Sequence, residues 1–296
     1  MIKRRPAVMA AIRHVDRFRW LASRAFRITK IDAAFLKAKS PKVFGDDLAD
    51  LLARQPAAAL DIVNQRVIAY QLYAHLGNLA RQFGIDFVID AGAHSGQFAS
   101  TLYGYGGFKG EVHSFEPVKK YYDVLASYLH HYQGWKAYNA ALGDVPGPSE
   151  IFVGKGHGGT SSLLPQTEAL EKFAPDVVLG APERILVRRV DEAFGDVLRD
   201  PKRRVMLKLD VQGFEERVLK STGEFIPNLK LVVMELSGIP LYEGQCRLGE
   251  ACSMMEELGF ALIFTCNSFG RNQSVFIDYD FVFCRTTDLE NLELVS

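Results

Sequence analysis

Apolar residues recur along this chain with two different periods, and the change falls near residue 84. Before that point they recur every three or four positions, which predicts amphipathic helices: one stripe begins at Val8 and another covers roughly 58–83. After it, short runs rich in β-branched residues alternate with helical stretches. Seven runs have the length of strands: Phe87–Asp90, Glu111–Phe115, Trp135–Ala140, Val205–Val211, Leu229–Leu236, Phe260–Cys266 and Phe281–Cys284.

Strands that alternate with helices predict an α/β fold with a doubly wound sheet. The continuous apolar run 231–234 is typical of a parallel strand that is buried on both faces. An insertion at about 149–193 adds two strand-like pieces, a glycine-rich loop and a short helix. We therefore expect a helical extension over residues 1–83 and a ligand-binding domain over 84–296, with ligands beyond the carboxyl ends of the strands.

Charge is unevenly distributed, although 35 basic and 35 acidic residues cancel. Residues 1–42 hold 12 Lys and Arg against 2 Asp and Glu, so this segment carries a net charge of +10. Three interpretations remain open: a helical cap that also supports a homodimer, a helix on a membrane surface or lipid-linked substrate, and a nucleic-acid contact. We expect no nucleic acid, because the rest of the chain is acidic and lacks a strip of aromatic and basic residues.

The four cysteines and the longest apolar runs exclude several classes of protein. No Cys-x-x-Cys pair occurs, which excludes a disulfide scaffold and a zinc ribbon and favours a reducing compartment. No apolar run approaches the roughly 18 residues that a membrane span needs. The sequence therefore predicts a cytoplasmic protein, with peripheral membrane contact through residues 1–42 left open.

The strongest chemical signal follows the first predicted strand, in the segment 88–98. The strand ends at Asp90, and Gly92 and Gly96 form a turn that leads into a helix. Small residues let a ligand approach the backbone, and the free amides of a helix N-terminus bind carboxylates or phosphates. The dinucleotide pattern Gly-x-Gly-x-x-Gly and the P-loop are both absent, so the spacing suits a nucleoside with an amino-acid tail. The alternative is a tight turn that binds nothing.

The next two strand ends carry residues suited to the same ligand. Glu116 can accept both hydrogen bonds of a ribose diol, and Pro117 suits the start of the following helix. Ala141 and Leu142, after the third strand, are placed to flank a flat purine. Each is a weak signal alone, since acids at strand ends often cap helices, but the three strand ends together indicate a nucleoside site.

The fourth and fifth strands supply candidates for catalysis. Lys208 and Asp210 alternate with apolar neighbours, so both point to one face, where Asp210 could deprotonate an acceptor with Lys208 as its charge partner. Glu235 closes the fifth strand, and His157 lies in a glycine-rich loop that could close over a substrate. The alternatives are a structural ion pair or helix cap, and a surface loop with an incidental histidine.

In these motifs the chain resembles the FkbM-type S-adenosylmethionine-dependent methyltransferases. The motifs are VIDAGAHSGQF, SFEP, NAALGD, GGTSSLLP, LKLDVQGFEERVLK and VVMELS, spread in order over about residues 86–285. The resemblance implies a Rossmann-like sheet of seven strands, mostly parallel with the last strand antiparallel. It implies S-adenosylmethionine as cofactor and methyl transfer to a hydroxyl of a sugar, glycan or natural product. The implied cofactor contacts are Asp90, Gly92, Ala93, His94 and Gly96 for methionine, Glu116 for ribose, and Ala141 and Leu142 for adenine. We also expect Pro117 and Asp210 to contact the cofactor.

Two positions depart from the family pattern. The family usually has Asn in place of His94 and Glu in place of Gln212. The second change removes a carboxylate near the expected active site, which favours the alternative of a non-catalytic cofactor-binding or scaffold protein that retains the fold. The cluster Asp90, Glu116, Asp210 and Glu235 favours the enzyme. No set of residues has metal-ligand spacing, so we expect no metal.

Overall fold

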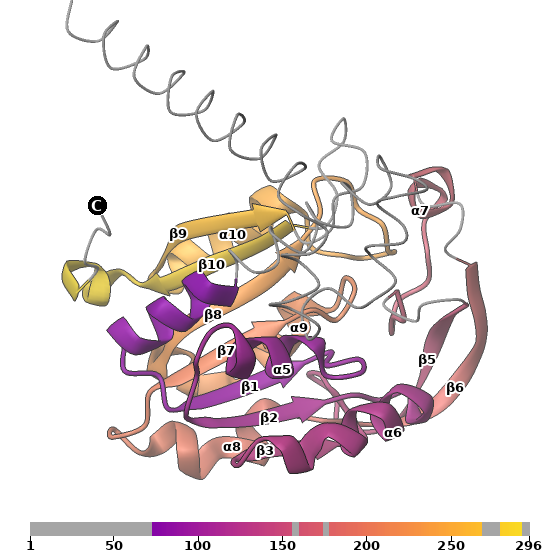
Figure 1. Ribbon diagram of the computed structural model, residues 1–296. Coiled ribbons are helices and arrows are strands. Elements are labelled where there is room, and N and C mark those ends of the chain that lie inside the picture. Colours follow the sequence, from indigo (N-terminus) through magenta and orange to yellow (C-terminus); the bar gives the residue numbers. More distant parts are fainter. Residues whose placement is uncertain (1–72, 156–159, 174–177, 268–278, 292–296) are drawn as a thin grey trace, which may run out of the picture. The chain divides into compact units, whose positions relative to one another are not determined.

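The computed structural model describes residues 73–155, 160–173, 178–267 and 279–291 (Figure 1). His157, the basic segment 1–42 and most of the predicted helical extension lie outside these ranges. The predicted helix that ends near residue 83 is described only over its last part, where residues 73–82 are helical. The proposed boundary at residue 83 stays a prediction. Within the ranges described, no helix is long and apolar enough to cross a membrane.

A seven-stranded sheet forms the centre of the domain, in the order β3-β2-β1-β7-β8-β10-β9. All neighbours pair in parallel except β10, which runs antiparallel to β8 and to β9. The predicted sheet, mostly parallel with its last strand antiparallel, is therefore confirmed. Its strands are β1 (Phe87–Ala91), β2 (Glu111–Phe115), β3 (Trp135–Tyr138), β7 (Val205–Leu209), β8 (Leu229–Leu236), β9 (Phe260–Asn267) and β10 (Tyr279–Arg285).

Helices cover both faces of this sheet, because the buried strands are apolar on both sides. On β1, Phe87 and Ile89 pack into one apolar cluster with α8, α9 and α10, whereas Val88 packs into a second with α5 and the helix 73–82. The helices are α5 (Gln97–Gly104), α6 (Lys119–Tyr128), α8 (Val190–Arg199), α9 (Glu215–Lys220) and α10 (Leu248–Glu257), with short 3₁₀ turns η1 (Leu129–His131), η2 (Gly223–Asn228) and η3 (Thr286–Asn291).

The predicted insertion contributes two strands to a second, three-stranded sheet beside the main one, and the third strand precedes it in the sequence (Figure 1). This second sheet consists of β4 (Ala141–Leu142), β5 (Gly147–Lys155) and β6 (Val178–Arg188), with α7 (Glu168–Phe173) between β5 and β6. The third strand of the main sheet is shorter than predicted and ends at Tyr138. The Asn139 amide donates hydrogen bonds to the carbonyls of Glu116 and Pro117, and Ala141 and Leu142 pair with β6 instead.

The direction of winding reverses between β1 and β7. From β1 the chain crosses to β2 on one side, and the later strand β7 lies on the other side of β1. The connections at their carboxyl ends therefore diverge and leave a crevice, which is the usual ligand site of such sheets. Gly92 and Asp210 follow these strand ends, and Glu116 follows the end of the neighbouring strand β2.

Candidate functional site

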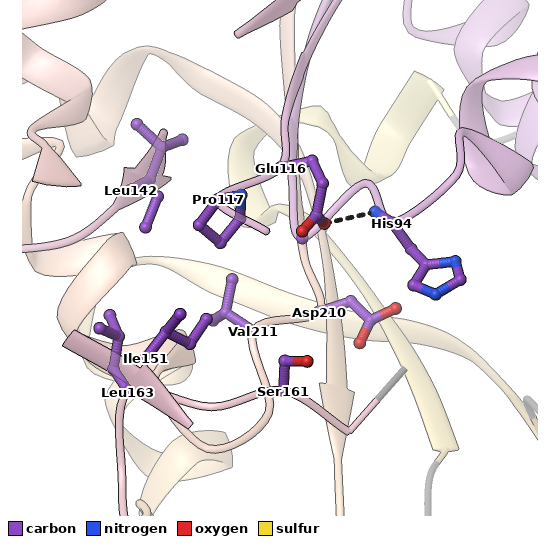
Figure 2. Close-up of a pocket in the computed structure, with 11 residues that line it drawn as sticks. His94, Glu116, Pro117, Leu142, Ile151, Ser161, Leu163, Asp210 and Val211 are labelled. Atoms are coloured by element: carbon purple, nitrogen blue, oxygen red, sulfur yellow. Dashed lines mark hydrogen bonds between the residues drawn. The ribbon is translucent and has the colours of Figure 1, made fainter. Parts of the chain in front are cut away.

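A pocket lies at this reversal, with one polar end and one apolar end (Figure 2). The polar end holds His94, Glu116, Asp210 and Ser161. The other end holds the apolar side chains of Pro117, Leu142, Ile151, Leu163 and Val211. Its eleven lining residues are Gly92, His94, Glu116, Pro117, Ala141, Leu142, Ile151, Ser161, Leu163, Asp210 and Val211. Seven of these are predicted cofactor contacts, since Asp210 was expected on both the cofactor and the catalytic side.

The turn between β1 and α5 requires its small residues. Gly92 has a φ of 78°, and a Cβ there would come 1.7 Å from the carbonyl oxygen of Asp210. Gly96 has a φ of 87°, and its Cβ would come 2.8 Å from the Trp135 ring. His94, between them, adopts a left-handed φ of 49° without being glycine. The turn can thus follow this path only if Gly92 and Gly96 lack side chains.

Glu116, at the end of β2, fixes this turn and faces the pocket. Its Oε2 accepts a hydrogen bond of 2.8 Å from the His94 backbone N–H, and its Oε1 accepts one of 2.8 Å from that of Val118. Burial raises the pKa of Glu116 to about 7, although both N–H groups favour the ionised form. Each oxygen keeps a free lone pair, so the carboxylate retains the acceptors that a ribose diol requires.

An ion-pair network lies under the pocket. Asp90 is fully buried and is not one of the lining residues; its Oδ2 accepts a hydrogen bond of 2.8 Å from Ser114. Lys208 Nζ lies 3.7 Å from Asp90 Oδ1 and 3.0 Å from Asp210 Oδ2, and it donates to the Gly92 carbonyl at 3.3 Å. Burial alone would lower the pKa of Lys208, but the two carboxylates raise it well above its ordinary value. The lysine is therefore a fixed cation.

Asp210 connects this network to the pocket. Its side chain is 33% exposed. Burial alone would raise the pKa of Asp210, but the charge of Lys208 and hydrogen bonds with Glu235 and Gln212 hold it below the ordinary value. Asp210 is thus an anion at neutral pH that offers hydrogen-bond acceptors to the pocket. The structure brings it together with Lys208, as the alternation along the strand predicts.

Gln212, which was not among the predicted site residues, joins Glu235 to Asp210. The side-chain amide of Gln212 donates to Asp210 Oδ1 at 3.0 Å and to Glu235 Oε2 at 2.6 Å. Tyr242, in the loop after β8, donates to the amide oxygen of Gln212 at 2.9 Å. The sequence does not identify Tyr242 as a site residue, because its surroundings, Pro-Leu-Tyr-Glu-Gly, indicate only a turn. Among the described residues, no group of three could hold a metal.

The apolar end of the pocket is shared by the two sheets. The residues that line it are Ala141 and Leu142 of β4, Ile151 of β5 and Leu163, which follows the loop after β5. These side chains form an apolar slot of the kind that holds a flat base. Ile151, Ser161, Leu163 and Val211 were not predicted as contacts, although Ser161 and Leu163 belong to the quoted GGTSSLLP motif. Asp90, Ala93 and Gly96, which were also predicted as contacts, are buried and do not line the pocket.

The sheet order and the polar strand ends match the Rossmann-like methyltransferase sheet that the sequence predicts. A family model described as the methyltransferase FkbM domain matches residues 90–262. Because this match covers more than half of the 296 residues, the chain belongs to the FkbM methyltransferase family. The resemblance, the fold and the cofactor predicted from the sequence are thereby confirmed.

Solved structures of several methyltransferases resemble this chain at low sequence identity. One is a magnesium protoporphyrin IX methyltransferase from Synechocystis PCC 6803 with bound S-adenosylmethionine (12% identity, 87% of this chain and 96% of that chain, TM-score 0.41). Another is a methyltransferase from Aquifex aeolicus (11%, 70% and 87%, 0.37). A third is 1,6-didemethyltoxoflavin-N1-methyltransferase from Burkholderia thailandensis (11%, 82% and 88%, 0.38). A search of curated protein sequences gives no significant match.

Proposed function

We propose that this protein transfers the methyl group of S-adenosylmethionine to a hydroxyl of a sugar, glycan or glycosylated natural product. The observation that carries the proposal is the pair of joined carboxylates, Asp210 and Glu235, beside the cofactor pocket. Hydrogen-bond acceptors placed there suit an acceptor rich in hydroxyl donors. The choice of oxygen over nitrogen or carbon as the methylated atom is part of the proposal.

The pocket residues fit the cofactor. Glu116 would hold the ribose hydroxyls, and the apolar slot around Leu142 and Ile151 would hold adenine. Gly92 lines the pocket without a side chain, so the backbone of the turn is accessible to the methionine part. When bound, S-adenosylmethionine supplies a methyl group on a positively charged sulfur, which is already a good leaving group.

Because the leaving group is good, the main task of the protein is alignment. Orienting the acceptor in line with the reacting bond can contribute about 7–11 kcal/mol, and a positioned base about 10²–10⁴-fold in rate. The acceptor oxygen forms the bond to the methyl carbon, sulfur keeps the electron pair of the broken bond, and the hydroxyl proton passes to a carboxylate. Asp210, held ionised by Lys208, would orient the hydroxyl, while Glu235 shares the proton. His157 stays a further candidate.

Calorimetric titration tests the cofactor half of this proposal. We expect micromolar binding of S-adenosylhomocysteine, lost in Glu116→Ala and unchanged in Glu150→Ala, which removes an exposed carboxylate from β5. Asp90→Ala should also weaken binding, since it removes a buried support of the turn. Absence of binding in the folded wild-type protein would contradict the proposal.

Transfer of a labelled methyl group tests the acceptor half. Labelled S-adenosylmethionine would be incubated with a panel of neutral sugars, uronic acids, glycans and amines, and the product analysed for a methoxy signal by NMR. Methoxy products from sugars would support the proposal. Tight cofactor binding with no transfer to any acceptor would favour the non-catalytic alternative, and N-methyl products would overturn the O-methyl assignment.

A further inference from the structure

We propose that Gln212 and Tyr242 are positioning residues for methyl transfer: Tyr242 orients the Gln212 amide so that its NH₂ group bridges Asp210 and Glu235, and this bridge fixes the arrangement and protonation of the carboxylates that meet the acceptor. The inference deepens the proposed function and rests on it. It assigns roles to two residues that do not themselves line the pocket.

The backbone of Gln212 is held in an unfavourable conformation by contacts on several sides. Its φ of 54° is left-handed, a region that side-chain-bearing residues rarely adopt. Ser162 Oγ donates to its carbonyl at 2.6 Å, and Glu215 Oε1 accepts hydrogen bonds from the N–H groups of Val211 and Gly213 on either side. Strained residues that their surroundings hold in place are concentrated at functional sites.

The side chain of Gln212 has one productive orientation. Carboxylate oxygens that carry no proton only accept hydrogen bonds, so the NH₂ end of the amide faces Asp210 Oδ1 and Glu235 Oε2, at 3.0 and 2.6 Å. The oxygen end then accepts from Tyr242 at 2.9 Å. The Tyr242 ring also packs 3.1 Å from the position of a Cβ on Gly213, so the phenol is fixed by the turn that it supports. Tyr242 is buried, and its hydroxyl lies 3.2 Å from the Thr160 carbonyl, so Gln212 is the nearer of two acceptors for its hydrogen.

The charges around the bridge explain why a neutral donor matters there. Asp90 on β1 and Asp210 after β7 lie beside the positive charge of Lys208, and Glu235 on β8 is joined to Asp210 by the amide. Asp280 on β10 is the register partner of Glu235, and Glu215 begins α9 beside Asp210. The charges of Lys208, Asp90 and Asp210 also act on the hydroxyl of Tyr73, on the helix 73–82. The amide of Gln212 supplies two donors to this acidic group without adding a further negative charge.

Exchanging the amide for a carboxylate of the same shape separates this role from simple packing. Gln212→Glu keeps the volume but removes both donors and adds a charge, Gln212→Met removes the donors alone, and Tyr242→Phe removes the orienting hydroxyl. Gln133→Glu, at an exposed position after η1, is the matched control for added charge. The carboxyl groups are followed by ¹³C NMR titration in the full chain, with S-adenosylhomocysteine binding measured in parallel.

We expect Gln212→Glu to raise the apparent pKa of the Asp210–Glu235 pair by at least about one unit, because a third carboxylate disfavours ionisation of the other two. Gln212→Met and Tyr242→Phe should raise it less, and Gln133→Glu should leave it unchanged. Binding of S-adenosylhomocysteine should stay within about threefold of wild type in all of them. With an acceptor from the panel, kcat should fall at least tenfold in Gln212→Glu, and the acid limb of its pH profile should move up with the pair.

Two results would overturn the inference. One is a carboxyl titration that is the same in wild type, Gln212→Glu and Tyr242→Phe. The other is a lower kcat with an unmoved pH profile, which indicates a structural role only. Failure of the proposed function is recognised separately, because it would appear in the wild-type protein as absence of cofactor binding or of methyl transfer to hydroxyls, whatever the titration shows.

Discussion

Two turns at the edge of the sheet each hold a non-glycine residue in a left-handed backbone conformation, but the two residues contribute to the site in different ways. The turn after β1 holds His94 at a φ of 49°, and the turn after β7 holds Gln212 at 54°; among the described residues these are the non-glycine positions with positive φ. In the first turn the contact to the site comes from the backbone, because the His94 N–H donates to Glu116. In the second turn it comes from the side chain, because the amide of Gln212 donates to Asp210 and Glu235.

Residues 94 and 212 therefore differ in how much substitution each tolerates. A backbone N–H is present in any residue except proline, so the contact to Glu116 survives a change at residue 94. A side-chain amide that spans two carboxylates survives no such change at residue 212. Both positions depart from the family pattern, yet only the departure at Gln212 alters the chemistry of the site. Four changes, three substitutions and a shift of pH, test this contrast through their effects on stability and cofactor affinity.

Removing the cation beneath both turns should have the largest effect. Lys208 donates to the Gly92 carbonyl of the first turn and to Asp210 of the second. Lys208→Met should destabilise the fold by about 3–5 kcal/mol, because it leaves buried carboxylates without a partner. Denaturant unfolding measures this. Adding Asp90→Asn should recover part of the loss, whereas Lys220→Met, at an exposed ion pair, should change little.

Adding a methyl group where the two turns touch should have the next largest effect. Gly92→Ala combines a left-handed φ with an overlap at the Asp210 carbonyl, so we expect a loss of about 2–3 kcal/mol and of cofactor binding. Gly84→Ala is the control, because its φ is 64° but nothing lies within 4 Å of its Cβ. Equal losses of stability in the two variants would mean that the contact between Gly92 and the Asp210 carbonyl does not limit substitution at residue 92.

Acid should weaken the first turn selectively. Burial raises the pKa of Glu116 to about 7, and a ribose diol needs the ionised form. Affinity for S-adenosylhomocysteine should therefore be constant above pH 8 and fall as pH drops through 7, about tenfold weaker at pH 6. Glu116→Gln should abolish this dependence, whereas Glu215→Gln should keep it, although the pKa of Glu215 is also raised to about 7. Calorimetry across pH 5.5–8.5 measures it.

Replacing the side chain of His94 should have the smallest effect. His94→Asn keeps the N–H that donates to Glu116 and suits a left-handed φ, but loses the stacking on Tyr121 at a centroid distance of 4.1 Å. We expect stability within about 1 kcal/mol of wild type. Cofactor affinity should stay within about threefold. A loss of affinity comparable to that of Glu116→Ala would show that the imidazole itself binds the ligand.

Most of the sheet was predictable because each strand is a short apolar run between helical stretches. β2 and β8 begin and end where the pattern places them. β3 and β7 each end two residues earlier than predicted, and the early end of β3 depends on the Asn139 amide and two carbonyls of another segment. Contacts of this kind between distant segments have no periodicity along the chain, so the transfer of Ala141 and Leu142 to the second sheet could not be predicted.

The site was predictable where chemistry sits at strand ends and less so where it depends on loops. Glu116 and Asp210 face the pocket, as acids that end parallel strands should. Asp90 was expected as a cofactor contact, but it shares the face of β1 with Val88 and is buried under α5, where Ser114 and Lys208 contact it. Tyr242 reaches Gln212 across thirty residues of sequence, and no local pattern predicts that contact.

The position of Trp135 behind the first turn makes it an intrinsic optical reporter. Its ring presses on Gly96, and its Nε1–H donates at 3.0 Å to Ser114, which in turn donates to Asp90. The chain contains only one other tryptophan, Trp20. A Trp20→Phe protein would therefore emit from a single indole that is coupled through one hydroxyl to the buried carboxylate, so that fluorescence could follow cofactor entry in real time without an added label.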